Sequence, residues 1–217
     1  NPPAALNAAE QAHHAILPCQ AVPRSDLLLE AREVASVEDI PRRCIDVRIA
    51  ARDRLAPDVM RLLLAPLPGQ HLRWLPGQYI DVLLDDGRRR AFSLARAPHI
   101  GNELEIHVRH VAGGGFTSQV FDELNVGDGL RIEGPQGTFV PREDSERAVI
   151  LVAGGTGFAP VKALVEHFLH LGSRRRMRLY WGARSVADLY LRALPEHWAH
   201  EVATLDFTAV VSDPLEA

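Results

Sequence analysis

The 217-residue sequence contains only two cysteines, Cys19 and Cys44, which are too few for a disulfide framework. This cysteine usage fits a reducing compartment, so we expect a cytoplasmic protein. The sequence has no run of about 20 apolar residues, the length of a membrane helix, and no basic-then-apolar signal opens it. A net charge of −4 gives no global basic field, which argues against nucleic acids and anionic membranes as partners.

Zinc-ligand spacings are also missing. The ten histidines include two pairs that are three residues apart, His167 with His170 and His197 with His200, on segments expected to be helical. No set of cysteines or carboxylates with zinc spacing accompanies these pairs. We therefore interpret them as solvated helix positions.

What is present is an ordinary globular composition, with 47% hydrophobic and 24% charged residues. The length suggests two compact units. Residues 1–35 differ from the rest, because a segment rich in alanine, proline and asparagine precedes two short apolar runs that look like small strands. This segment is too short to bury a core alone, so it is an arm or the remainder of another domain. Residues 36–42 form the expected linker.

Residues 43–143 follow a period of two. In the first predicted strand Ile45, Val47 and Ile49 face one way and the residues between them face the other. Cys44, on this strand, is expected to be a buried structural cysteine. Further strands are predicted at residues 59–64, 79–84, 91–95, 104–111 and 130–133, with glycine-containing turns between them. Short strands at this spacing predict a closed antiparallel barrel or a sandwich.

Residues 146–217 alternate between strands and helices instead. A continuous apolar strand at 148–153 leads into a helix whose apolar stripe includes Leu164 and Phe168. A strand at 177–181, a helix around 188–198 and a strand at 205–211 follow. This order predicts a parallel α/β sheet.

The most informative motif is the glycine-rich turn at 153–160, which follows a buried strand and opens a helix. Its glycines let backbone N–H groups approach a pyrophosphate, and the helix N-terminus adds partial positive charge. Pro160 suits the first turn of a helix, where its missing N–H has no partner. A purely structural strand-to-helix turn is the alternative interpretation.

Two weaker motifs lie in the predicted barrel. Arg90-Ala91-Phe92-Ser93 offers a cation, an aromatic face and a hydroxyl, the groups that a flavin nucleotide needs, although an ordinary edge strand would show the same alternation. His107-Val108-Arg109, followed by Gly113-Gly114-Gly115-Phe116-Thr117, combines a strand, a glycine turn and a helix start that can cradle an anion. Thr117 could equally be a simple helix N-cap.

In this order and separation, the motifs resemble those of the ferredoxin-NADP reductase superfamily over roughly residues 43–217. Arg90-x-Phe92-Ser93 is similar to that family's Arg-x-Tyr-Ser flavin motif, and Gly113-Gly114-x-x-Thr117 to its second flavin phosphate motif. Gly155-x-Gly157-x-x-Pro160 is similar to its nicotinamide pyrophosphate loop. Glu133-Gly134-Pro135-x-Gly137-x-Phe139 resembles the turn that closes the barrel, and Tyr180-Trp181-Gly182-x-Arg184 resembles the second nucleotide-binding strand end.

The resemblance implies a six-stranded antiparallel Greek-key FAD-binding barrel at 43–143 and a parallel-sheet α/β NAD(P)-binding domain at 146–217. It also implies an NAD(P)H-dependent oxidoreductase that holds FAD, or else FMN, and uses NADH or NADPH. Ser93 would be catalytic and donate to the flavin nitrogen that accepts the hydride. Phe92 replaces the usual tyrosine, which removes a hydrogen bond worth about 1 kcal/mol but keeps the stacking surface. The implied cofactor-binding residues are Arg90, Phe92, Ser93, His107, Val108, Arg109, Gly114, Gly115, Thr117, Gly154, Gly155, Thr156, Gly157, Pro160 and Arg184.

Within residues 1–35, Leu17-Pro18-Cys19-Gln20 followed by Ser25-Asp26-Leu27 resembles the end of a plant-type ferredoxin domain. In this interpretation the segment is the C-terminal remnant of that domain, and Cys19 is the fourth ligand of a 2Fe–2S cluster. The other three ligands form a C-x4-C-x2-C run that this sequence lacks, so the cluster belongs to the full-length protein. The alternative for Cys19 is a buried structural cysteine.

The order of ferredoxin remnant, barrel and nicotinamide domain most closely resembles the CDP-6-deoxy-glucoseen reductase type. The reductase components of multicomponent oxygenases share it, so the acceptor is expected to be a dehydrase or an oxygenase component. A free flavin reductase and a flavin-binding electron-transfer subunit without productive nicotinamide binding are the alternatives. The family continues for some tens of residues beyond the last position of this sequence, so we expect the nicotinamide domain to be incomplete.

Overall fold

The computed structural model describes residues 40–213 without a break and, before them, residues 7, 9, 12, 13, 17, 21, 22 and 24–26. The chain divides into two compact units, Asn1–Ala35 and Ser36–Ala217. In the first unit the backbone N–H of His13 donates to the carbonyl oxygen of Ala9 at 3.0 Å. The expected cluster ligand Cys19 and most of the two short strands predicted near it lie outside the described residues.

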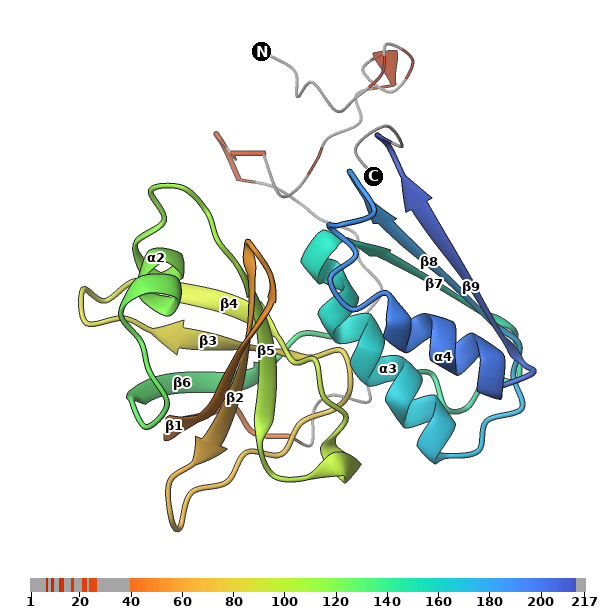
Figure 1. Cartoon of the computed structure of the whole chain (residues 1–217). Coiled ribbons are helices and arrows are strands. Elements are labelled where there is room, and N and C mark those ends of the chain that lie inside the picture. Colours follow the sequence, from red (N-terminus) through yellow and green to blue (C-terminus); the bar gives the residue numbers. More distant parts are fainter. Residues whose placement is uncertain are drawn as a thin grey trace. The chain divides into compact units, whose positions relative to one another are not determined.

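The larger unit begins with six strands in one antiparallel sheet (Figure 1). The spatial order is β4-β3-β6-β1-β2-β5. The two edge strands are joined by a bridge between Leu94 and Ile106 and by a hydrogen bond from the Ala95 N–H to the Glu105 carbonyl at 2.8 Å. The sheet therefore closes into the predicted barrel. Its strands are β1 (Arg43–Ala56), β2 (Val59–Pro66), β3 (Tyr79–Leu83), β4 (Arg89–Ser93), β5 (Leu104–Arg109) and β6 (Gly129–Gln136).

The alternation along β1 explains how the barrel fills its core. Ile45, Val47 and Ile49 are at most 6% exposed, and they pack with apolar residues of the other five strands. Cys44 lies on β1 as predicted, but it is exposed, so its assignment as a buried structural cysteine was wrong. The reason is the period of two, because the register that buries Ile45 turns Cys44 to the outside.

The second part of this unit is a three-stranded parallel sheet in the order β7-β8-β9. Its strands are β7 (Val149–Gly154), β8 (Met177–Ala183) and β9 (Leu205–Val211), and its helices are α3 (Phe158–His170) and α4 (Ala193–Glu201). Leu151, Leu179 and Trp181 are buried in one cluster with Phe158 of α3 and Trp198 of α4. Both helices therefore cover the same face of the sheet (Figure 1). The predicted fold class, an antiparallel barrel followed by a parallel α/β sheet, is confirmed.

The second helix of this sheet starts later than the sequence predicted, at Ala193 instead of about Asp188. Asp188 closes a turn, because its carboxylate accepts from the N–H of Ser185 at 3.2 Å and from the Ser185 hydroxyl at 3.3 Å. Pro195 then stands in the first turn of α4, where a missing N–H costs nothing. A side chain that bonds the local backbone competes with helix formation, which explains the delay.

The described residues lack both a membrane-spanning helix and a metal-binding cluster. No helix formed by them is long and apolar enough to cross a membrane. They also contain no group of three or more histidine, cysteine, aspartate or glutamate residues that could hold a metal ion.

Candidate functional site

A pocket of about 530 Å³ brings both barrel motifs together with the glycine-rich loop. Strand β4 contributes four consecutive residues, strand β5 contributes two, and helix α2 (Gly115–Asp122) contributes its first turn. The rest of the wall comes from Val111 and Gly114 before α2, from Thr156 and Gly157 before α3, and from Ala159 of α3. Of the residues predicted to bind a cofactor, this pocket contains Arg90, Phe92, Ser93, His107, Arg109, Gly114, Thr117, Thr156 and Gly157.

Phe92 gives the pocket an aromatic surface that is fixed from behind. Its ring lies 5.6 Å from that of Phe116, at an interplanar angle of 51°, and packs against the barrel core. Arg90 is half-buried, and its Nη1 donates to the carbonyl oxygen of Arg89 at 2.9 Å. Strand β4 thus lines the pocket with an aromatic ring, a cation and, at Ser93, a hydroxyl.

The turn into α2 is tight enough to require glycine. A Cβ at Gly114 would lie 2.6 Å from the Thr117 hydroxyl and 2.9 Å from the Val111 carbonyl oxygen. Thr117 is the third residue of the helix, and its Oγ1 accepts from the N–H of Val111 at 3.2 Å. Gly114 occupies the N-cap, so the alternative of Thr117 as a simple N-cap is wrong.

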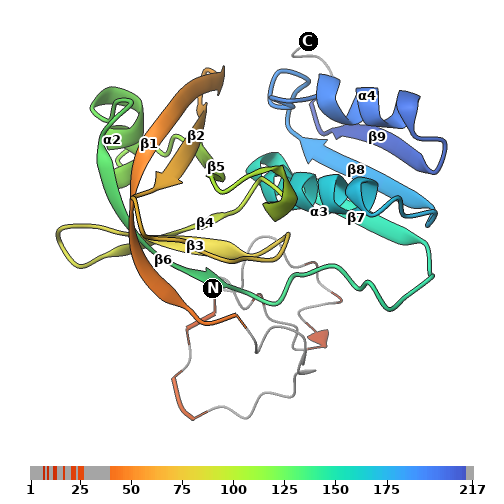
Figure 2. The same cartoon turned by 90° about the horizontal axis from the view of Figure 1, so that it is seen from below.

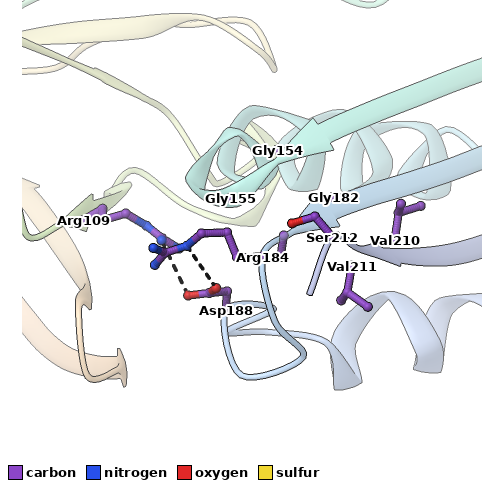
Figure 3. Close-up of a pocket in the computed structure, with 10 residues that line it drawn as sticks. Arg109, Gly154, Gly155, Gly182, Arg184, Asp188, Val210, Val211 and Ser212 are labelled. Carbon is purple, nitrogen blue, oxygen red and sulfur yellow. Dashed lines mark ion pairs between the residues drawn. The ribbon is translucent and has the colours of Figure 1, made fainter. Parts of the chain in front are cut away.

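A second pocket, of about 420 Å³, lies at the carboxyl ends of the parallel strands (Figure 3). Ligands of open α/β sheets bind at this edge. Of the predicted cofactor-binding residues, Gly154, Gly155, Arg109 and Arg184 line it. The rest of the wall comes from Gly182, Ala183, Asp188, Val210, Val211 and Ser212.

Arg109 belongs to both pockets. Its Nη1 lies 3.2 Å from Asp58 in the barrel and 3.7 Å from Asp188 after β8. The Nε and Nη2 atoms are buried, and neither has a hydrogen-bond partner in the described part of the chain. A buried donor without a partner is costly, so this guanidinium fits an anionic ligand. Asp58 and Asp188, which hold it in place, were not identified from the sequence.

Trp181 holds the glycine-rich loop in place, a role that was not predicted from the sequence. The indole N–H of Trp181 donates to the carbonyl oxygen of Gly155 at 3.0 Å, and its ring stacks on Phe158 at 3.9 Å. Gly155 has a φ of +50°, a conformation that favours glycine. A Cβ at Gly154 or Gly157 would meet no atom within 4 Å. The loop therefore exposes its backbone to the pockets, as a pyrophosphate site requires.

His107 has no free nitrogen for a ligand. Its side chain is fully buried, with Nε2 2.9 Å from Glu105 and Nδ1 2.9 Å from the Tyr190 hydroxyl. Burial lowers the pKa of His107 below its ordinary value, against the opposing effect of Glu105, so the ring is neutral. Only its carbon atoms and backbone are available to a ligand.

Four other predicted residues have distinct positions. The side chain of Val108 is buried in the barrel core, and Val108 lines neither of these two pockets. Gly115 lines a third pocket, of about 380 Å³, next to Arg88. Pro160 is the third residue of α3, in the first turn as expected. Arg184 is exposed, with its Nε 3.6 Å from Asp188.

The geometry describes two adjoining pockets with local positive charge, an aromatic face and a pyrophosphate-type loop, which fits a flavin beside a dinucleotide. The family model of the oxidoreductase FAD-binding domain matches residues 46–140, and that of the oxidoreductase NAD-binding domain matches residues 151–217. The chain belongs to the FAD- and NAD-binding oxidoreductases of the ferredoxin reductase type. The predicted resemblance is therefore confirmed.

Curated relatives and a solved structure agree with this family. The chain is 35% identical over 207 residues to CDP-6-deoxy-L-threo-D-glycero-4-hexulose-3-dehydrase reductase of Yersinia pestis, covering 95% of this chain and 62% of the relative. It is 33% identical to terephthalate 1,2-dioxygenase reductase component 1 of a Comamonas species, covering 91% and 59%. The Amycolatopsis cytochrome P450 reductase GcoB superimposes with a TM-score of 0.75 at 33% identity, covering 95% and 63%. The chain thus spans about three fifths of the length of these proteins.

Proposed function

We propose that this chain is the flavin- and nicotinamide-binding part of a reductase that passes electrons from NAD(P)H through FAD to a 2Fe–2S cluster and a partner enzyme. The strongest support is one pocket wall, in which Phe92 and Ser93 of the flavin motif occur together with Thr156 and Gly157 of the glycine loop. Ligands held at the two motifs would meet there. Bound FAD supplies the exchange between the electron pair of a hydride and single electrons.

On the flavin side, the protein's own residues bind and orient. Arg90 and Arg109 supply positive charge for phosphate oxygens, and the first turn of α2 adds its backbone N–H groups. Phe92 offers its ring as a packing surface. The hydroxyl of Ser93 donates a hydrogen bond to the reacting edge of the flavin ring. We assign the remaining flavin contacts to His107, Gly114 and Thr117, which line this pocket, and not to Val108 and Gly115, which do not line it.

On the nicotinamide side, the N-terminus of α3 receives the pyrophosphate. The backbone N–H groups of residues 154–157 lie at this end of the helix, where its partial positive charge favours an anion. Arg109 and Arg184 flank the same pocket with full positive charges. Thr156 and Gly157 face the flavin pocket, so the nicotinamide end of the nucleotide belongs there. Pro160 lies in the first turn of α3, where its lack of a backbone N–H is tolerated.

The rest of the electron path is proposed from the sequence and from the names of the relatives. We assign residues 1–35 to the end of a 2Fe–2S ferredoxin-like domain with Cys19 as a ligand, 36–42 to a linker, 43–143 to the FAD domain and 146–217 to an incomplete NAD(P) domain. The Yersinia pestis relative is a dehydrase reductase, which supports a dehydrase as the partner. The Comamonas relative favours an oxygenase component as the second candidate. The two cysteines favour the cytoplasm.

A substitution at Gly154 tests the nicotinamide site with little risk to the fold. Gly154 has extended backbone angles that any residue can adopt, and a Cβ there would enter open space at the pocket wall. We expect Gly154→Val to retain flavin and thermal stability but to weaken NADH and NADPH binding at least tenfold, with Gly154→Ala intermediate. Equal nucleotide affinity in all three proteins would contradict the site. A parent that binds flavin but no nucleotide would favour the electron-transfer subunit instead.

A further inference from the structure

A buried ammonium group lies between the barrel and the parallel sheet. Lys162 of α3 has a side chain only 9% exposed, and its Nζ donates to the carbonyl oxygen of Ala95 at 2.9 Å. The same nitrogen lies 2.7 Å from Glu166 Oε1 and 3.3 Å from Glu105 Oε1. A lysine is almost never buried unless it is paired, and here one carbonyl and two carboxylates, from the barrel and from α3, surround it. Figure 2 shows α3 beside the barrel. The bond to Ala95 attaches this helix to the barrel two residues after the end of β4.

Glu166 strengthens the same attachment. Its Oε1 accepts from Lys162, while its Oε2 accepts from the backbone N–H of Ala97 at 3.1 Å. Ala95 and Ala97 are both fully buried. The segment 95–97 is therefore held by helix α3 at two points, one carbonyl and one N–H.

The residues that make these contacts lie close in sequence to the two proposed cofactor motifs. Ala95 is two residues after Ser93, the hydroxyl of the flavin motif, and Lys162 is five residues after Gly157, the end of the glycine loop. One helix turn and one short segment thus connect the two cofactor motifs through Lys162. Lys162 and Glu166 themselves line neither of the two pockets.

Glu105, the other carboxylate beside Lys162, extends the network to His107 in the pocket wall. Burial alone raises the pKa of Glu105, but the hydrogen bond from His107 and the charge of Lys162 bring it below its ordinary value, so Glu105 is ionised. His107 is neutral and donates from Nε2 to this carboxylate, which leaves Nδ1 to accept from the Tyr190 hydroxyl. Burial raises the pKa of Tyr190, which keeps that hydroxyl protonated as a donor. Every member of the network then has one defined role.

Ion pairs of this kind are poor candidates for simple stabilisation. Desolvation of buried charges offsets much of their attraction, and apolar side chains of similar volume often stabilise a protein equally well. Directional bonds between charged groups do something that apolar packing does not, because they fix one register between two surfaces. The network joins two elements that each carry a cofactor motif. Fixing their relative position is the role that its geometry suits.

We propose that Lys162 and Glu166 are positioning residues that set the glycine loop of the nicotinamide site at its distance from Ser93 in the flavin pocket. This inference rests on the proposed function of the two pockets. A displacement of about 1 Å between reacting groups can cost roughly a hundredfold in rate, while each group still binds its own ligand. The two residues therefore control the rate of flavin reduction and not the affinity for either nucleotide.

The test compares Lys162→Met with the parent, both loaded with FAD. Stopped-flow absorbance gives the rate constant of flavin reduction, and titrations give the dissociation constants of flavin and of NAD⁺. The long-wavelength absorbance of a nicotinamide stacked on a flavin is a further readout. We expect a loss of about 10- to 100-fold in the rate constant, a weaker long-wavelength band, and dissociation constants within threefold of the parent.

A matched control and two further variants make the outcome decisive. Glu143→Gln removes an exposed carboxylate that lies 2.7 Å from the half-buried His167 of α3, and it should leave every readout unchanged. Lys162→Met combined with Glu105→Gln and Glu166→Gln avoids unpaired buried charges, and it should be as slow as the single variant. Glu166→Gln alone, which keeps an oxygen acceptor for Ala97, should be slowed less.

Four results overturn the inference. A folded Lys162 variant that is reduced within twofold of the parent shows that the network does not position the two sites. A rate constant and dissociation constants that decline together with melting temperature show a structural role only. If neither Lys162 variant folds, a rate constant of flavin reduction in Glu166→Gln equal to that of the parent overturns the inference in the same way. A parent that neither NADH nor NADPH reduces overturns the proposed function, and this inference falls with it.

Discussion

Trp181 of strand β8 donates its indole N–H to the carbonyl oxygen of Gly155 at 3.0 Å, so a core residue of the parallel sheet holds Gly155 of the glycine-rich loop. Trp181→Phe removes this bond and part of a fully buried ring. We expect a loss of about 2 kcal/mol in unfolding free energy, from the bond and the resulting cavity, and weaker NAD⁺ binding. Urea unfolding and calorimetric titration measure the two effects.

The matched control for this variant is Trp74→Phe. Trp74 is also buried, and its indole N–H donates to the Arg96 carbonyl oxygen at 3.1 Å in the barrel. The control should lose similar stability with no change in NAD⁺ affinity. Equal losses of affinity in both variants would show that Trp181 acts on stability alone.

Ser93 lines the flavin pocket and is predicted to bond the reacting edge of the flavin. Ser93→Ala should slow flavin reduction about fivefold, because one hydrogen bond contributes about 1 kcal/mol, and should change flavin affinity less than threefold. Single-turnover absorbance at saturating NADH gives the rate constant. Ser118, a half-buried serine of α2 that does not line this pocket, provides the control in Ser118→Ala. Unchanged reduction kinetics in Ser93→Ala would exclude the assigned role.

Arg109 lines both pockets and has two buried nitrogens with no partner among the described residues. Arg109→Met should weaken both flavin and NAD⁺ binding by about 10- to 100-fold, since a hydrogen bond to a charged group contributes about 1.5 to 3 kcal/mol. Fluorescence titration of the flavin and calorimetry of NAD⁺ measure the losses. Arg178→Met, at an exposed arginine 3.9 Å from Asp206, should change neither. A loss confined to one ligand would contradict the shared role.

His107 should make the stability of the fold depend on pH. Its pKa is lowered in the folded protein, so below about pH 6.5 the unfolded chain binds a proton that the folded chain does not. Unfolding free energy should then fall on acidification from pH 7 to 5, by up to about 1.4 kcal/mol per pH unit. The lowered pKa of Glu105 acts in the same direction, but only near and below its ordinary value of 4.5.

His107→Gln retains a donor for Glu105 and an acceptor for Tyr190 but does not titrate. We expect its unfolding free energy to fall less steeply with acid, by the equivalent of up to one proton. His99 also has a lowered pKa, because of its partial burial and the nearby His170 and His167, but it is present in both proteins and cancels in the comparison. Urea unfolding at pH 7, 6 and 5 measures the slopes. Parallel slopes in parent and variant would mean that His107 binds protons equally in the folded and unfolded states, so that its pKa is not lowered by the fold.

Much of the fold was predictable because local patterns and global burial agree. The alternation of Ile45, Val47 and Ile49 is the alternation of the barrel wall, and the apolar run at 148–153 became strand β7 within one residue. The expectation of a buried strand holds for one face of β7 only, because Ile150 and Val152 are 69% and 72% exposed. The late start of α4 was not predictable from periodicity, because the side chain of Asp188 bonds its own turn. The exposure of Cys44 was deducible from the alternation, which outweighs the general tendency of cysteine to be buried.

The candidate site likewise contains residues that could be predicted from the sequence and contacts that could not. Residues within one motif, such as Phe92 and Ser93, come together because a single strand carries them. The contacts of Arg109 with Asp58 and Asp188 span 51 and 79 positions of the sequence, so no local sequence pattern could predict them. Lys162 lies on an otherwise apolar helix face. Its burial could not be predicted from the sequence, because the groups that pair with it there, Ala95 and Glu105, belong to the barrel.

Transfer of a hydride from NAD(P)H to flavin in this protein can be tested by the visible absorbance spectrum of the flavin-loaded protein, recorded without oxygen before and after addition of NADH or NADPH. We expect a flavin spectrum that is bleached rapidly by at least one of the two nucleotides. In the full-length protein, the absorbance of a 2Fe–2S cluster should decrease as well. A protein that carries flavin, binds both nucleotides and is bleached by neither would contradict it.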